Sequence, residues 1–267
     1  MFIRDAFATP WRHRHLIARL ARREIAARYR GSLLGPIWAV AMPLCMVGVY
    51  AFAFATVFQS RIAPPNGRDV PFVLLLFIGL LLFQLFAEVV QASPGIVRAN
   101  PAYVKQVIFP LEILPVISFV VALFNTSLTM LVLLVFHLFM IGLPSPGGLW
   151  IPLIALPLAF LAIGLGWMFA ALGPFLRDMT QVAALLCTAL MFLSPIFYSL
   201  ESVPERLRWI IALNPLTTVV VQSRDALFAG QIPEWGALGL CLVASLAVFV
   251  GGFWIFRSAR PAFADVM

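Results

Sequence analysis

Aromatic side chains recur at helical spacing in one of the apolar stretches of this sequence. Tyr50, Phe54 and Phe58 are each four residues apart, so they share one face of a helix. Sugar rings present C–H faces that stack on aromatic side chains without needing a charge. This stripe is therefore a candidate wall of a substrate channel for carbohydrate, and ordinary helix packing or a lipid-facing belt is the alternative.

A second aromatic group lies near the end of a later apolar stretch. Phe192, Phe197 and Tyr198 flank Pro195, which we expect to bend the helix where the channel opens. These three residues complete the candidate substrate channel.

Polar side chains form a further stripe. Gln84, Glu88 and Gln91 follow one another at spacings of four and three residues. Such a stripe either lines a water-filled path or lies at the lipid headgroups, and the sequence leaves both open. Glu112, the other acidic residue close to an apolar stretch, is expected to cap helical N–H groups or to pair with Lys105.

The sequence predicts no catalytic residue and no metal site. No combination of nucleophile, base and orienting group is present, and the lone His137 is expected to be a buried, hydrogen-bonded residue. Cys45, Cys187 and Cys241 lie inside apolar runs and are expected to be buried thiols. The chain has no Walker-type glycine loop, so it cannot bind and hydrolyse ATP by that device.

The composition places these residues in a membrane. Of the 267 residues, 63% are hydrophobic and only 11% are charged, and the mean hydropathy is +1.01. A soluble protein carries roughly 25% charged residues. We therefore predict an all-α integral membrane protein, with spans of about 20 apolar residues. Six transmembrane helices are expected, at about residues 36–58, 71–90, 113–142, 150–176, 179–200 and 235–256.

Two further segments complete the expected organisation. Residues 1–30 are predicted to form an amphipathic interface helix with a basic face, ahead of a six-span domain over residues 31–267. Between the fifth and sixth spans, Trp209–Ser223 is uncharged but too short to cross and is interrupted by Asn214 and Pro215. We expect a re-entrant hairpin there.

Charge sets the expected orientation. With both termini cytoplasmic, 13 of the 18 Lys and Arg residues fall on the cytoplasmic side. The net charge of +7 is therefore attributed to topology and to membrane lipids, and no nucleic-acid partner is expected.

Four stretches resemble the ABC type-2 exporter permeases of the polysaccharide-export branch. They appear in the expected order and span residues 28 to about 230. Tyr103 and Gln106 depart from the usual pattern of the second stretch. The stretches are 28–38 with 42–44, 100–115, 177–181, and 192–198 with 203–204, 214–217 and Arg224.

The resemblance implies a permease that forms a homodimer and binds two copies of a separate nucleotide-binding ATPase subunit. ATP and Mg²⁺ would be held by that partner, so this chain is expected to be neither an enzyme nor the holder of a cofactor. The substrate it implies is a lipid-linked polysaccharide such as an O-antigen or a capsule chain. Transport would cross the cell inner membrane, from cytoplasm to periplasm.

The resemblance also suggests residue roles. Coupling to the ATPase would involve Arg98, Asn100, Tyr103, Lys105, Arg177 and Asp178. The cytoplasmic gate would contain Arg28, Tyr29, Arg30, Gly35 and Trp38. The periplasmic gate would contain Ser194, Pro195, Asn214, Pro215 and Arg224.

Two alternatives remain open. Within the same resemblance, the substrate could be teichoic acid or a small amphiphile or drug. From another class, an ion-coupled secondary transporter typically needs several carboxylates near the membrane midplane. Here only Glu88 and Glu112 come close, and both lie near the ends of spans.

Overall fold

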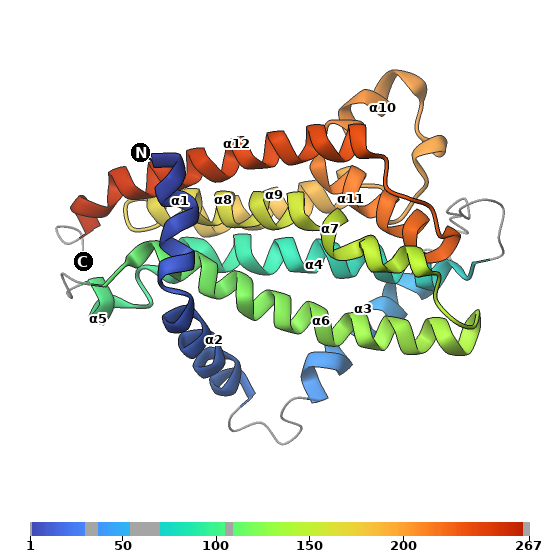
Figure 1. Ribbon diagram of the computed structural model, residues 1–267, viewed down its shortest axis with the longest axis horizontal. Coiled ribbons are helices and arrows are strands. Elements are labelled where there is room, and N and C mark those ends of the chain that lie inside the picture. Colours follow the sequence, from blue (N-terminus) through green and yellow to red (C-terminus); the bar gives the residue numbers. More distant parts are fainter. Residues whose placement is uncertain (1, 30–36, 54–69, 105–108, 264–267) are drawn as a thin grey trace.

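The computed structural model describes residues 2–29, 37–53, 70–104 and 109–263 as a bundle of helices (Figure 1). No β-strand occurs within these residues. The all-α prediction is confirmed, and the statements below concern this described part of the chain.

Four helical stretches are long and apolar enough to cross a membrane. They fall on the predicted second, third, fourth and sixth spans and run side by side in the bundle (Figure 1). The central one is the most buried, since 78% of its most apolar window lies inside the fold. Their helices are α4 (Phe72–Ile96), α6 (Leu114–Met140), α8 (Leu156–Leu172) and α12 (Trp235–Ala259).

Helices α3 (Trp38–Ala51) and α9 (Met179–Leu193) match the predicted first and fifth spans but have only 14 and 15 residues. α9 ends seven residues before the predicted boundary. Ser194 has an extended backbone (φ −98°, ψ 145°), because the ring of Pro195 disfavours a helical residue before it. The remainder of the first predicted span lies outside the described residues, and six crossings remain a proposal.

The predicted fourth span is interrupted near its start. It begins with a 3₁₀ turn (Pro146–Trp150) and the short α7 (Ile151–Ile154), and it breaks at Ala155 before α8. Pro157 lacks the N–H that a continuous helix would donate across this break. At the other end α8 stops at Leu172, before Gly173 and Pro174, four residues short of the expected boundary.

The N-terminal segment forms two helices and not one. α1 (Phe2–Arg12) crosses the bundle, and α2 (Arg14–Tyr29) slopes away from it (Figure 1). On α2, Ile17 and Ala21 are buried against the bundle while the arginines are exposed. The amphipathic character is as predicted, with a break at His13.

The segment between α9 and α12 folds as a helical hairpin. α10 (Glu205–Ala212) projects from the bundle, whereas α11 (Pro215–Arg224) lies within it beside α4, α8 and α12 (Figure 1). The Asn214 side chain accepts a hydrogen bond from the Leu216 N–H at 3.1 Å and caps α11. A five-residue π-helical turn (Asp225–Ala229) follows α11.

Both ends of the described chain lie at one end of the bundle. α1, the end of α12, the short helix α5 (Pro101–Val104) and the turn between α8 and α9 gather there, on the left of Figure 1. α10 and α11 lie toward the opposite end. This arrangement agrees with an even number of crossings.

Candidate functional site

A cavity of about 880 Å³ lies among α3, α4 and α6, and we call it the central cavity. Its wall combines aromatic and other apolar side chains with amides, hydroxyls and one ion pair. The aromatic lining is Trp38, Tyr50, Phe77 and Phe83, and the polar lining is Arg28, Gln84, Glu88, Gln91, Asn125, Thr126 and Thr129. A lining of this mixed kind suits a ligand with both apolar and hydroxyl-rich parts.

The stripe of Gln84, Glu88 and Gln91 lies along this cavity. Of the two interpretations that the sequence left open, the structure favours the polar path. Glu88 forms an ion pair with Arg28 of α2 and also accepts hydrogen bonds from the Asn125 side-chain amide, at 2.9 and 3.2 Å to its two oxygens. Three elements therefore converge on one carboxylate.

The charged cluster extends to Glu24, one turn before Arg28 on α2. Desolvation raises the pKa of the Glu24 carboxyl, while Arg28 lowers it and Glu88 raises it. Like charges and burial thus favour protonation of Glu24, and Arg28 opposes it.

Two of the predicted cytoplasmic-gate residues, Arg28 and Trp38, line the central cavity. The side chain of Tyr29, together with Arg30 and Gly35, lies outside the described part of the structure. The candidate gate is therefore represented by the two side chains that reach the cavity from α2 and α3.

The predicted channel aromatics meet at one point. The Tyr50 ring lies 5.4 Å from the Phe197 ring between centroids, and Phe197 lies 5.8 Å from Phe192. Tyr50 lines the cavity, but Phe197 is only 3% exposed and packs in the core. The Tyr198 hydroxyl donates to the Phe192 carbonyl at 3.1 Å. Phe54 and Phe58 lie outside the described residues.

The predicted periplasmic-gate residues form one buried cluster around Arg224. Its guanidinium donates to the carbonyls of Leu75, Pro195 and Ile196 at 2.9, 2.6 and 2.8 Å, and the residue is 5% exposed. A buried cation of this kind is tolerated only when its donors are satisfied. Arg224 therefore joins α11 to α4 and to the turn after α9.

A second contact in this cluster involves Asn214 and Ser194. The Asn214 amide donates to the Ser194 hydroxyl oxygen at 2.8 Å, and that hydroxyl donates to the Leu190 carbonyl at 2.6 Å. Pro215 occupies the first position of α11, where its missing N–H costs nothing. All five residues thus serve one junction between the hairpin and α9.

The two predicted coupling segments are joined to each other. The Arg98 guanidinium donates to the Pro174 carbonyl at 3.0 Å, linking the end of α4 to the turn between α8 and α9. Asn100 donates to the Ile96 carbonyl at 2.9 Å and closes the end of α4. Arg177 and Asp178 are exposed in the second segment.

The short helix α5 carries Tyr103, whose ring stacks on Phe109 with centroids 4.3 Å apart and planes at 6°. Lys105 lies outside the described residues. α5 is therefore anchored to the chain that leads into α6.

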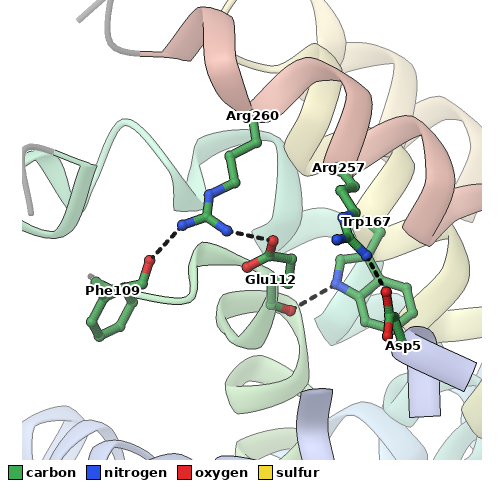
Figure 2. A network of polar contacts seen from close by, with 6 residues as sticks. All are labelled: Asp5, Phe109, Glu112, Trp167, Arg257 and Arg260. Atoms are coloured by element: carbon green, nitrogen blue, oxygen red, sulfur yellow. Dashed lines mark hydrogen bonds and ion pairs between the residues drawn. The ribbon is translucent and has the colours of Figure 1, made fainter. Parts of the chain in front are cut away.

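Glu112 has a partner that sequence reasoning missed. Arg260, beyond the end of α12, donates to the Glu112 carboxylate at 2.7 Å and to the Phe109 carbonyl at 3.1 Å (Figure 2). The predicted pairing with Lys105 falls outside the described residues. Of the residues that the sequence did not single out, Asn125 had a detectable signal, because it begins a short polar break, Asn125–Ser127, inside an apolar helix.

The remaining predictions concern buried polar residues. His137 is buried, its Nδ1 lies 3.0 Å from the Gly142 carbonyl, and its ring stacks on Phe228, as expected. Cys187 and Cys241 are buried free thiols, but Cys45 is exposed on α3, which contradicts the expectation for that residue. The reason is that α3 turns this side away from the rest of the described chain.

Known permeases resemble this chain along nearly its whole length. It is 29% identical over 254 residues to the O-antigen export system permease protein RfbA of Klebsiella pneumoniae, covering 94% of this chain and 95% of the relative. It is 26% identical over 257 residues to the RfbA permease of Myxococcus xanthus, covering 96% of each. It is 25% identical over 245 residues to the polysialic acid transport protein KpsM of Escherichia coli, covering 90% and 92%. Since residues 15–228 match the family described as ABC-2 type transporter, this chain belongs to that family.

Proposed function

We propose that this chain is the transmembrane permease subunit of an ATP-driven exporter that moves a polysaccharide across the inner membrane. The observation that carries the proposal is the similarity, over at least 90% of the chain, to permeases named for O-antigen export and polysialic acid transport. The substrate is proposed to be lipid-linked.

The central cavity supports a carbohydrate substrate. Trp38 and Tyr50 offer ring faces for stacking, and Gln84, Gln91 and Asn125 offer amides that pair with hydroxyl groups. The neighbouring methionines of α3 provide an apolar surface on the same wall. A sugar chain and a lipid part would both find matching side chains here.

The energy for transport is proposed to come from a nucleotide-binding ATPase, present in two copies alongside two copies of this chain. ATP and Mg²⁺ would be bound by that subunit. The surface around Arg98, Tyr103, Arg177 and Asp178 is the proposed docking site, because its two segments lie together at one end of the bundle and are joined through Arg98 and Pro174.

Six crossings with both termini in the cytoplasm are part of the proposal. α3 and α9 would supply the first and fifth crossings together with their flanking residues, and α10 with α11 would form the re-entrant hairpin. The common location of α1, α5 and the end of α12 supports this topology.

An ion-coupled transporter is the rival from another class. The two acidic residues that the sequence offers for ion coupling, Glu88 and Glu112, are each paired with an arginine, Arg28 and Arg260. A carboxylate already neutralised by arginine is poorly suited to bind and release a transported cation.

Deleting the gene in its host tests the proposal. We expect a cell surface depleted of one polysaccharide, accumulation of that polymer inside the cell, and rescue by the plasmid-borne gene. Chemical analysis of the accumulated polymer distinguishes an O-antigen or capsule chain from teichoic acid. An unchanged surface polysaccharide, with altered export of a small amphiphile, would contradict the proposed substrate.

A further inference from the structure

The network drawn in Figure 2 joins three parts of the chain that lie far apart in the sequence. It contains the segment Phe109–Glu112, the end of α12 with Arg257 and Arg260, and Asp5 of α1. The inference below rests on the proposed function, because it concerns how movement of the coupling segment reaches the cavity.

Arg260 holds the coupling segment at two points. One guanidinium nitrogen donates to the Glu112 carboxylate at 2.7 Å and the other to the Phe109 carbonyl at 3.1 Å. The fork of donors in an arginine makes this double contact possible, and a lysine has no equivalent geometry. Because the Phe109 ring stacks on Tyr103 of α5, the same guanidinium is one residue away from the proposed docking helix.

Glu112 is fixed from its main chain as well. Its carbonyl accepts a hydrogen bond from the Trp167 indole of α8 at 2.8 Å, and both residues are buried. The second carboxylate oxygen of Glu112 accepts no hydrogen bond from the described residues. A buried carboxylate with so few partners in the described chain depends strongly on Arg260.

α8 and α12 form a rigid support for this contact. A Cβ atom added to Gly252 would lie 2.0 Å from the Gly164 carbonyl oxygen, so the two backbones touch. The ring of Trp167 packs on Phe249 and Phe253 of α12, at 4.8 and 5.1 Å between centroids. Displacement of Arg260 is therefore coupled to displacement of the end of α12.

Arg257, three residues before Arg260, connects the same helix end to α1. Its guanidinium donates to the Asp5 carboxylate at 2.5 Å, and Phe7 of α1 packs on Phe249 at 5.1 Å. α1 leads directly into α2, whose Arg28 pairs with Glu88 at the central cavity.

We propose that Arg260 is a positioning residue that makes the coupling segment, the end of α12 and the helix pair α1–α2 move as one unit. Movement of α5 by the ATPase is thereby transmitted to Arg28 and Glu88 at the cavity. Arg257 is the second joint of this link.

The test uses the complete complex of this chain with its ATPase subunit, reconstituted in proteoliposomes. The variants are Arg260→Gln and the reversed pair Glu112→Arg with Arg260→Glu. The matched control is Arg208→Gln on α10, whose guanidinium also donates to two carbonyls but lies outside the link. The measured quantities are polymer exported per ATP hydrolysed and amide hydrogen exchange in α1 and α2, with and without ATP.

We expect the Arg260→Gln complex to form and to hydrolyse ATP, with polymer exported per ATP reduced by about 2- to 30-fold, the range of mutations that weaken coupling. ATP-dependent changes of exchange in α1 and α2 should be lost, and the reversed pair should restore part of both. Arg208→Gln should behave as the wild type. Wild-type export per ATP and wild-type exchange in Arg260→Gln would overturn the proposal.

If Arg260→Gln does not assemble, Arg260→Lys decides the matter. Lysine keeps a positive charge beside Glu112 but cannot reach Phe109 through the same group, so reduced export per ATP supports the link and a wild-type ratio overturns it. A wild-type complex that exports no polymer contradicts the proposed function instead. In that case hydrogen exchange still decides the link, because ATP binding needs no glycan.

Discussion

The guanidinium of Arg28 on α2 forms an ion pair with the carboxylate of Glu88 on α4, 60 residues further along the chain. The pair lies at the central cavity, where Asn125 of α6 holds the same carboxylate. It connects an interface helix, whose other charged residues are exposed, to the most buried of the long apolar helices. The position of α2 is thus tied to the state of the cavity.

Replacing Glu88 by Gln should release α2 from the cavity while leaving the bundle folded. Arg28 is 44% exposed, so we expect a loss of at most about 1 kcal/mol in unfolding free energy. Hydrogen exchange in α2 should increase and export should fall. Gln91→Ala, which also alters the cavity wall but removes no charge, serves as the control. Unchanged exchange in α2 would show that the ion pair does not hold it.

The sequence was sufficient to locate the helices that consist of uninterrupted apolar residues. α4, α6 and α12 match the predicted spans because burial in lipid and burial in protein both select apolar side chains. The ends were less predictable. Pro195 shortens α9 and Gly173 ends α8 early, because local backbone geometry and not hydropathy sets these boundaries.

The candidate site was predictable where residue types reported a role directly. The stripe of Gln84, Glu88 and Gln91 and the outer group around Arg224 were identified from polar residues in apolar surroundings. Their partners were not, because residues such as Asn125 and Leu75 contact them across long sequence separations. Such pairings arise from helix packing, which a hydropathy pattern does not contain.

Tyr50→Ala should reduce export without loss of assembly, since the ring lines the cavity and also touches Phe197. Tyr50→Phe keeps the ring and should retain most of the activity if stacking is its main contribution. Quantified surface polysaccharide and the yield of the purified complex are the two readouts. Normal export in Tyr50→Ala would assign this residue to helix packing alone.

Arg224→Met should destabilise the fold strongly, because three buried carbonyls lose their donor. Each buried group left without a partner costs about 1–3 kcal/mol, so a loss of at least about 3 kcal/mol is expected. Thermal unfolding in detergent measures it. Arg206→Gln, at an exposed site on α10, should unfold at the wild-type temperature. An Arg224→Met variant as stable as the wild type would show that this junction is dispensable.

Gly173→Ala should displace the turn between α8 and α9 from the end of α4. A Cβ atom there would lie 1.9 Å from the Pro94 carbonyl oxygen, a distance that the two backbones cannot accommodate without moving. We expect a lower unfolding temperature and weaker binding of the ATPase subunit. At Gly239, a Cβ meets nothing within 4 Å, so Gly239→Ala should be neutral or stabilising by up to about 1 kcal/mol. Equal behaviour of the two variants would contradict the close packing at Gly173.

ATP-driven polysaccharide transport by the reconstituted complex is the measurement that tests the central claim most directly. The purified chain alone should hydrolyse no ATP, and the complex with its ATPase subunit should hydrolyse ATP and move polymer into proteoliposomes only when ATP is supplied. Transport by the isolated chain, driven by an ion gradient and independent of ATP, would contradict the account.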